Sequence, residues 1–376
     1  MILPGATVGI LGAGQLGRMI AVAARQLGYA VRVYSPPGDN PATEVAQGFE
    51  APWDDADALA RFADGCGVVT YEFENVPVST VAQVLTRAPV FPSATLLATT
   101  QDRIAEHALL DRLGIGHAPG RRVQTVAEFD DALVALGRPS RLKTARGGYD
   151  GGGQWAIRDD EGVARARAQV DGARVFRLER DVPFDAEVSV VLARGADGAV
   201  QTFPVFENVH RSGVLHRTTW PAEVSPAVAT RARELAVSLA EAVDLVGTLT
   251  VECFVVGESV LVNELAPRVH NSGHLTLEAC SVSQFEQHVR AVCGLPLAVP
   301  VVRGPACMVN LLGDTSRDRV TLDLVEALRI PETHVHLYGK QSVRARRKMG
   351  HVTSLGATRA EAVSRAEAAW ASLRWA

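Results

Sequence analysis

The sequence lacks the features of a secreted, membrane-spanning or zinc-binding protein. Its five cysteines are an odd number, lie far apart and form no Cys-x-x-Cys pair, which argues for a reducing compartment and against a zinc site. The first residues lack the basic region of a signal peptide, and no uninterrupted apolar run approaches the ~18 residues that a membrane helix needs. We therefore expect a cytoplasmic protein.

The chain also lacks a strong excess of charge of either sign. A formal net charge of −4 provides no broad basic surface for nucleic acid or for an anionic membrane. We therefore expect the protein to bind neither nucleic acid nor a membrane, although local anion-binding pockets remain possible. With 376 residues, 47% of them hydrophobic, the chain can form two or three domains around a large core.

Short β-rich runs alternate with helix-like segments in the first 95 residues. The predicted strands span 7–11, 30–34 and 68–71, and the predicted helices span 16–27, 56–63 and 79–85. This alternation indicates a parallel sheet covered by helices. Further helices are predicted over 100–113, after a capping box at Thr125–Glu128, after Ser225-Pro226 and after Thr358.

A glycine-rich turn, Gly12-Ala-Gly-Gln-Leu-Gly17, lies between the first predicted strand and helix, where a dinucleotide-binding turn would lie. The next strand ends at Val33-Tyr34-Ser35-Pro36, without the acidic residue that would bind a ribose hydroxyl. A nicotinamide site is therefore disfavoured. The glycines are left with three possible roles: a tight turn, helix packing, or anion binding at the helix N-terminus.

Glu252 and Glu264 lie on two β-rich runs separated by Gly257-Glu258, the pattern of a hairpin. If the connecting loop has three residues, the two carboxylates face each other. Such a pair repels by roughly 1 kcal/mol at 4 Å in water and by about 4 kcal/mol at an effective dielectric near 20. A cation would reverse that sign, and Mg²⁺ prefers one or two carboxylates together with waters and phosphates. The alternative is a register in which one acid points to solvent.

Polar residues continue directly after Glu264. Arg268 carries a planar guanidinium suited to a small oxyanion, and His270 and Asn271 add hydrogen-bond donors beside it. Asn263 precedes them on the second strand of the hairpin. This density of function favours an oxyanion pocket next to a metal-nucleotide site.

Lys143 precedes a loop with five glycines among residues 147–153. A flexible chain with free backbone N–H groups can wrap phosphates, and a nearby lysine can neutralise them. No Gly-Lys-Ser/Thr follows, so the loop is not a Walker A sequence. Tyr149 and Asp150 favour a specific lid over a disordered hairpin tip.

Other polar residues are ambiguous by themselves. Glu74 follows a strand at the edge where open parallel sheets bind ligands, but it fits a helix cap equally well. Taken alone, Glu179, Glu187 and His210 fit surface positions better than ligand positions. Cations that include Lys340 and Arg347 gather near the end of the chain, where either a phosphate partner or a solvated basic turn explains them. No Ser-His-Asp or Cys-His arrangement is recognisable from spacing.

Together these motifs resemble one family along nearly the whole chain, N5-carboxyaminoimidazole ribonucleotide synthetase, an ATP-grasp carboxylating enzyme of bacterial and fungal purine synthesis. The matching segments follow the order of the family and span 9–18, 71–77, 148–151, 264–274 and 347–351. The resemblance implies an α/β and α+β fold and a homodimer. The implied parts are a Rossmann-like N-terminal domain (1–98), an ATP-grasp core in two parts (99–176 with the lid, 177–305 with the metal site) and a small C-terminal domain (306–376).

The resemblance also implies residue roles. ATP phosphates would be held by Arg103, Lys143 and the loop Gly148, Tyr149, Asp150, Gly151, Gly152, Gly153 and Gln154. The remainder of the ATP site would comprise Glu179, Arg180, Asp181, Val182, Glu187, His210, Asn263 and Glu264. Mg²⁺ would be bound by Glu252 and Glu264. Catalysis around bicarbonate and carboxyphosphate would rest on Arg268, His270, Asn271 and Lys143. The substrate 5-aminoimidazole ribonucleotide would be bound by Glu74, Tyr149 and Asp150, with Lys340 and Arg347 on its 5′-phosphate.

The implied reaction joins bicarbonate to the exocyclic amine of this ribonucleotide, through carboxyphosphate, with release of ADP and phosphate. Two positions depart from the family: Gly152 replaces a basic lid residue, and 344–346 read Arg-Ala-Arg where the family has Arg-Pro-Gly. We expect Arg346 or another cation to compensate for the lid. The alternatives are a formate- or biotin-using ATP-grasp ligase, a nicotinamide-dependent oxidoreductase, and a non-catalytic nucleotide sensor.

Overall fold

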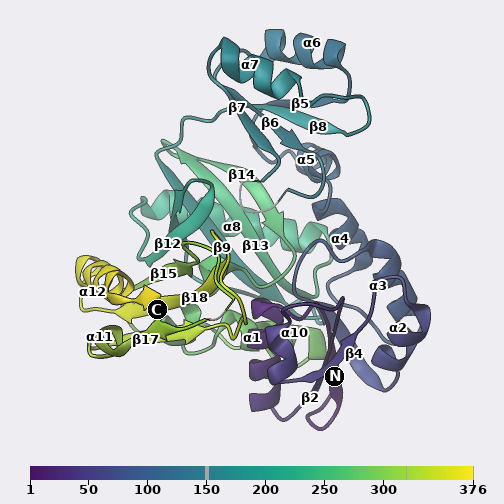
Figure 1. The fold of residues 1–376 in the computed structure, drawn as a ribbon, viewed down its shortest axis with the longest axis vertical. Coiled ribbons are helices and arrows are strands. Elements are labelled where there is room, and N and C mark those ends of the chain that lie inside the picture. The colour runs from purple at the N-terminus through teal and green to yellow at the C-terminus, as the bar shows by residue number, and fades with distance from the viewer. Residues whose placement is uncertain (149–151, 319, 376) are drawn as a thin grey trace.

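The structure of the chain is a computed structural model that describes residues 1–148, 152–318 and 320–375. The predictions for Tyr149, Asp150 and Gly151 lie outside the described residues. Figure 1 shows the described chain as three regions, with a small lid at one end, a central sheet, and the N-terminal and C-terminal segments side by side at the other end. In the described residues, none of the helices combines the length and the apolar character needed to cross a bilayer.

The N-terminal region is a parallel sheet between helices, as its alternating pattern predicts. Its strand order is β3 (Gln47–Glu50), β2 (Ala30–Ser35), β1 (Thr7–Leu11), β4 (Cys66–Tyr71). The helices are α1 (Gln15–Gln26), α2 (Ala56–Ala63) and α3 (Val78–Leu85), with a 3₁₀ turn at Pro41–Glu44. Sequence patterns did not predict β3, because this edge strand is largely exposed and carries no apolar run.

The lid spans residues 120–180, so it contains the glycine-rich loop. It is a four-stranded antiparallel sheet with two helices on it. Its strand order is β5 (Gly120–Val123), β8 (Phe176–Arg180), β6 (Ser140–Thr144), β7 (Gln154–Ile157), and its helices are α6 (Val126–Leu136) and α7 (Asp160–Arg167). The Thr125 capping box is confirmed. The helix predicted over 100–113 is present as α5 (Arg103–Arg112), and a separate helix that was not predicted, α4 (Ala94–Thr100), precedes it. The Asp102 side chain accepts the N–H of Ile104 and so begins α5 as a separate helix.

A nine-stranded antiparallel sheet forms the centre of the molecule. Its order is β14 (Ser259–Ala266), β13 (Gly247–Val256), β9 (Ala186–Arg194), β11 (Phe206–Arg211), β12 (Val214–Trp220), β15 (Ala306–Leu312), β18 (Lys348–Leu355), β17 (Thr333–Leu337), with β10 (Val200–Thr202) beside β9. The sheet crosses the predicted 305/306 boundary without interruption, because β12 pairs with β15. The residue limits of the domains stay a prediction.

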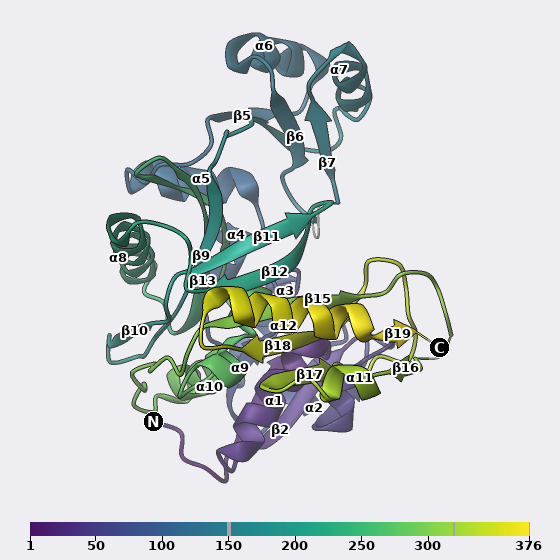
Figure 2. The same cartoon turned by 90° about the vertical axis from the view of Figure 1, so that its left-hand side faces the viewer.

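Helices cover this central sheet and join it to the N-terminal region. They are α8 (Pro226–Ala242), α9 (Thr276–Ala279), α10 (Gln284–Cys293), α11 (Val325–Leu328) and α12 (Arg359–Ser372), with a 3₁₀ turn at Asn271–Gly273 and a short pair β16 (Leu322–Asp323) and β19 (Arg374–Trp375). The N-caps predicted at Ser225 and Thr358 are confirmed. Figure 2 shows α12 lying along β15 and β18. Phe285 and Val289 of α10 belong to the same apolar core as Ile20 of α1, so α10 fixes the central sheet against the N-terminal region.

Candidate active site

The two predicted metal ligands face each other across the β13–β14 hairpin. The hairpin closes with the two-residue loop Gly257-Glu258, not with a three-residue loop, since Val256 pairs with Ser259. The register then shifts between Glu252 and Cys253, and Glu252 pairs with Glu264. A β-bulge at Asn263 therefore supplies the extra residue that the loop does not. The predicted pairing of the two glutamates is confirmed, but for a different structural reason.

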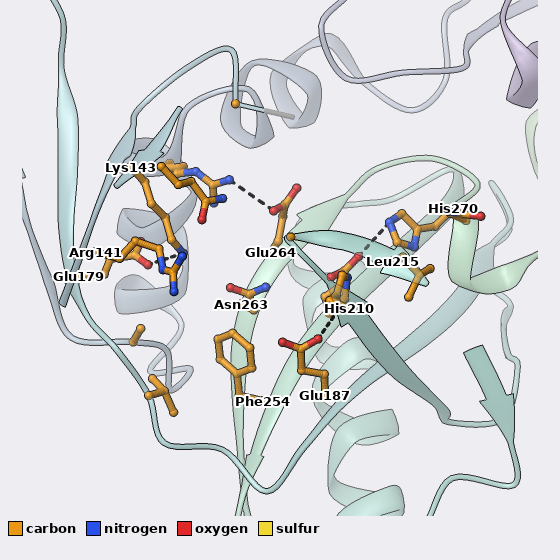
Figure 3. A pocket seen from close by; sticks show the side chains of 18 of the residues that line it. Arg141, Lys143, Glu179, Glu187, His210, Leu215, Phe254, Asn263, Glu264 and His270 are labelled. Carbon is orange, nitrogen blue, oxygen red and sulfur yellow. Dashed lines mark hydrogen bonds and ion pairs between the residues drawn. The ribbon is translucent and has the colours of Figure 1, made fainter. Parts of the chain in front are cut away.

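A cavity of about 520 Å³ lies between the lid, this hairpin and the loop that follows it. Its size is within the usual range for ligand pockets. Figure 3 shows Lys143, Arg141 and Glu179 on one side, His210, Glu187 and His270 on the other, and Asn263 and Glu264 between them. The predicted residues that line the cavity are Glu74, Arg103, Lys143, Gly148, Gln154, Glu179, Arg180, Asp181, Val182, Glu187, His210, Glu252, Asn263, Glu264, Arg268, His270 and Asn271.

In the lid, the Glu179 carboxylate lies among three cationic or protonatable side chains. Its oxygens are 2.6 Å from Lys143 Nζ, 3.1 Å from Arg177 Nε and 3.3 Å from His107 Nε2. Burial alone would raise the pKa of Glu179, but Lys143 and His107 hold it well below its ordinary value. Glu179 therefore orients Lys143 at the cavity wall. Sequence patterns did not predict His107 and Arg177, which lie outside every recognisable motif.

The Glu179 cluster predicts a pH-dependent stability. Because the folded-state pKa lies below the ordinary 4.5, the stabilisation is present above about pH 4.5 and is lost as the pH falls below that value. We expect Glu179→Gln to lower the free energy of unfolding at pH 7, and the difference from wild type to shrink at pH 3.5. Urea unfolding at the two pH values measures this. Glu161→Gln, which removes an exposed lid carboxylate paired with Arg165, is the control and is expected to change little. A wild-type to Glu179→Gln difference that does not change with pH would contradict the interpretation.

The two glutamates of the hairpin contact separate basic side chains in the structure. Arg103 Nη2 lies 3.4 Å from Glu264, and His270 Nε2 lies 2.9 Å from Glu252. Burial alone would raise the pKa of Glu252, but His270 and His210 lower it to about 2. Glu252 is therefore a carboxylate at neutral pH. His210 itself hydrogen-bonds Glu187, which also lines the cavity.

The donor set at this hairpin fits a magnesium ion that shares its ligands with a nucleotide. Two carboxylates oppose each other on rigid strands, and Glu252 is held in its charged form. Within the described part of the chain, no group of three or more His, Cys, Asp or Glu side chains is arranged to hold a metal ion. Two protein carboxylates with waters and phosphates is the arrangement that Mg²⁺ commonly adopts.

Next to the hairpin, Arg268 and Asn271 form a polar corner of the cavity. The Arg268 guanidinium pairs with the Glu74 carboxylate and donates to the Val269 carbonyl at 3.0 Å. Burial alone would raise the pKa of Glu74, but Arg268 lowers it, so the pair is ionic. The side-chain oxygen and nitrogen of Asn271 are both buried without a hydrogen-bond partner among the described residues. Because Asn271 lines the cavity, its amide is available to a polar ligand or to an ordered water.

The glycine-rich turn binds a carboxylate of the protein itself. The backbone N–H groups of Gly14 and Gly17 donate to the two oxygens of Glu72, at 2.5 and 2.6 Å. A Cβ on Gly12 would lie 2.3 Å from Glu72 Cγ, so only glycine fits there. Of the three roles left open for the motif, the one at the helix N-terminus is filled by the acidic side chain of Glu72, whose pKa is raised by burial. Glu72 occupies the place that a dinucleotide pyrophosphate would need, which agrees with the absence of a ribose-binding acid at the end of β2.

The predicted phosphate-binding cations lie outside the main cavity. Arg347 Nη1 pairs with Asp39 at 2.7 Å, and Asp39 also accepts the N–H of Gln341 at 3.0 Å. Burial, and then Arg347, lower the pKa of Lys340 to about 8. These residues join the N-terminal region to the C-terminal segment. Gly152 and Gly153 also do not line the cavity, and Gly153 accepts the N–H of Thr144 through its carbonyl.

Two aromatic rings at the cavity were not predicted. The rings of Phe184 and Phe254 stack at 4.7 Å between centroids with 7° between their planes, and both line the cavity. They offer an apolar surface for a flat base. The sequence could have indicated Phe254, because it lies two residues from Glu252 on the same strand and therefore on the same face.

Arg346, the predicted substitute for the lid cation, donates to the Ser212 carbonyl at 2.9 Å, next to the cavity residue Gly213.

Comparisons with known proteins identify three family regions in the chain. They are a ribonucleotide synthetase preATP-grasp domain over residues 5–101, an ATP-grasp domain over 108–285, and a phosphoribosylaminoimidazole carboxylase C-terminal domain over 306–365. The N5-carboxyaminoimidazole ribonucleotide synthase of Bacillus subtilis is 41% identical over 94% of this chain and 92% of its own length.

Solved structures agree over the whole fold. The ADP complex of an N5-carboxyaminoimidazole ribonucleotide synthetase has a TM-score of 0.92 and 40% identity, covering 98% of this chain and 97% of that one. The Aspergillus clavatus enzyme in complex with ADP and 5-aminoimidazole ribonucleotide has a TM-score of 0.87 and 29% identity, covering 97% of each chain. The chain thus belongs to the N5-carboxyaminoimidazole ribonucleotide synthase family and is an ATP-grasp ligase.

Proposed function

We propose that this chain carboxylates 5-aminoimidazole ribonucleotide with bicarbonate, using Mg-ATP, to give N5-carboxyaminoimidazole ribonucleotide, ADP and phosphate in purine synthesis. The relatives are named for this product, and one of them was solved with ADP and the ribonucleotide together. The observation that carries the proposal is the polar corner of the cavity. Buried Arg268 and the unpartnered amide of Asn271 lie in the same cavity as the opposed glutamates.

The nucleotide would lie between the lid and the hairpin. Phe184 and Phe254 would contact the base, and Lys143, held by Glu179, would contact the phosphates together with Arg103. Glu252 and Glu264 would hold Mg²⁺, which when bound supplies positive charge next to the transferring phosphoryl group. Arg103 would then contact a phosphate in addition to Glu264, because a guanidinium has five donors.

Bicarbonate would bind at Arg268 and Asn271, which supply guanidinium and amide N–H groups in a water-poor site. One bicarbonate oxygen attacks the γ-phosphorus, the bond to ADP breaks, and carboxyphosphate forms. The amine nitrogen then forms the C–N bond at the carboxyl carbon and gives up a proton. The C–O bond to phosphate breaks in that step or in an earlier release of CO₂, and phosphate keeps the former bicarbonate oxygen in both cases. Exclusion of water is essential, because free carboxyphosphate hydrolyses.

The ribonucleotide would approach from the side of the N-terminal region, where Glu74 meets Arg268. Lys340 and Arg347 would take its phosphate, which requires Arg347 to share its contact with Asp39. The predicted cytoplasmic location and homodimer belong to the same proposal. A formate- or biotin-using ligase and a nucleotide sensor are the alternatives, and their substrates or lack of turnover separate them.

Oxygen isotope transfer tests this reaction. With ¹⁸O-labelled bicarbonate, Mg-ATP and 5-aminoimidazole ribonucleotide, we expect one labelled oxygen per inorganic phosphate, because the bridging oxygen of carboxyphosphate leaves with phosphorus. Mass spectrometry of the phosphate measures it at early times, before bicarbonate exchanges with water. Unlabelled phosphate, formed at the rate of ADP release, would show that water and not bicarbonate accepts the phosphoryl group.

A further inference from the structure

A buried glutamine at the start of α10 holds the main chain of the polar corner. Gln284 is fully buried, its Oε1 accepts the N–H of His270 at 2.9 Å, and its Nε2 donates to the carbonyl of His270 at 2.6 Å. One side-chain amide thus binds both backbone groups of one residue. The same Nε2 lies 3.2 Å from Nδ1 of His274, another wall residue of the cavity.

The surrounding residues keep this amide in place. A Cβ on Gly273 would lie 2.3 Å from Gln284 Oε1, so the loop needs glycine there for the amide to reach His270. Thr276 Oγ1 accepts the backbone N–H of Gln284 at 3.0 Å and donates to the Gly273 carbonyl at 2.6 Å. Thr276 thus ties the start of α10 to the loop that Gln284 contacts.

The clamped residue lies in the middle of the predicted chemistry. His270 Nε2 contacts Glu252. Arg268 lies two residues before His270 in the chain, and Asn271 follows it directly. Fixing both backbone groups of His270 fixes the main chain from which its ring extends to Ser272 and Glu252, and it restrains the adjoining main chain that carries Arg268 and Asn271. Positioning of this kind matters because a displacement of about 1 Å can cost roughly 100-fold in rate.

We infer that Gln284 is a positioning residue that sets the geometry of Arg268, His270 and Asn271 for the carboxylation step; this inference rests on the proposed function. Gln284 contacts the loop and not the ATP side of the cavity. Its loss should therefore lower turnover and the coupling of ATP use to carboxylation, and leave nucleotide binding unchanged.

The same helix provides a matched control. Gln287, one turn later and also fully buried, binds both backbone groups of Ala298: Nε2 donates to the carbonyl at 2.7 Å and Oε1 accepts the N–H at 3.0 Å. Its partner lies in the loop after α10, away from the cavity. Gln284→Met and Gln287→Met thus remove the same kind of clamp from the same helix, and each leaves a backbone donor and acceptor unsatisfied.

The test compares the two variants by turnover with bicarbonate and the ribonucleotide, by ADP affinity in calorimetry, and by ADP formed per carboxylated product. We expect Gln284→Met to lose about 100-fold in kcat, to release excess ADP and to keep the wild-type affinity for ADP. Gln287→Met is expected to keep kcat and coupling. Equal losses in both variants, or wild-type kcat in Gln284→Met, would overturn the inference. A wild-type enzyme without dependence on bicarbonate and ribonucleotide would instead overturn the proposed function.

Gln284→Glu is a second variant that tests the same inference if Gln284→Met does not fold. A protonated carboxyl can donate to the His270 carbonyl and accept its N–H, as the amide does, and burial favours the protonated form. The activity of Gln284→Glu relative to wild type is therefore expected to rise as the pH is lowered from 8 to 6. A relative activity that stays constant or falls would count against a role in positioning.

Discussion

Replacement of Glu264 by glutamine is expected to reduce ADP release by orders of magnitude and to leave the fold intact. Glu264 is one of two opposed carboxylates that would hold Mg²⁺, and an amide is a much weaker ligand for that ion. Its side chain is 42% exposed, so little stability depends on its charge. The glutamine oxygen can still accept a hydrogen bond from Arg103. Steady-state ADP release over a range of Mg²⁺ concentrations, together with thermal unfolding, measures both parts of this prediction.

Glu258→Gln is the matched control for this variant. Glu258 lies in the turn of the same hairpin and is exposed, so its substitution changes the net charge equally without touching the opposed pair. We expect turnover close to wild type. Near wild-type activity of Glu264→Gln at saturating Mg²⁺ would remove Glu264 from the metal site.

Arg268→Lys is expected to lower kcat/KM for bicarbonate by roughly 100- to 1,000-fold, the effect of removing one essential donor from an oxyanion site. The substitution keeps the charge but loses the planar guanidinium, which contacts Glu74 and the Val269 carbonyl simultaneously. ADP affinity should not change, because Arg268 lies at the corner away from Lys143 and Glu179 and is not predicted to bind ATP. Initial rates at varied bicarbonate and calorimetric titration with ADP separate the two effects.

Arg290→Lys provides the corresponding control. Arg290 also pairs with a glutamate, Glu286, and also donates to a backbone carbonyl, that of Pro296, but on the outer part of α10. It is expected to leave the bicarbonate dependence unchanged. If Arg268→Lys has the same bicarbonate dependence as wild type, bicarbonate does not bind at Arg268.

Local sequence patterns predicted the parts of the fold that depend on short-range physics. The alternating N-terminal sheet and the capping box at Thr125 depend on neighbouring residues, and both are confirmed. The opposed glutamates were predicted from a loop length that is wrong, since a bulge at Asn263 sets the register. The position of a bulge cannot be recognised from one sequence, because the extra residue can lie on either strand of the pair.

The parts of the site that sequence did not predict depend on contacts between distant segments. Glu72 binds a glycine turn more than 50 residues earlier, Gln284 binds His270 from another element, and His107 of α5 contacts Glu179 of β8. No spacing rule connects such positions. Buried carboxylates and amides in these places are visible only once the three-dimensional partners are known.

The most direct measurement is ADP release from Mg-ATP with bicarbonate and 5-aminoimidazole ribonucleotide added singly and together. We predict a low rate with either substrate alone and strong stimulation when both are present, because the phosphoryl acceptor and the amine meet at Arg268 and Glu74. The same low rate in every mixture would contradict the assignment of the substrates and leave only the ATP-grasp fold and nucleotide site standing.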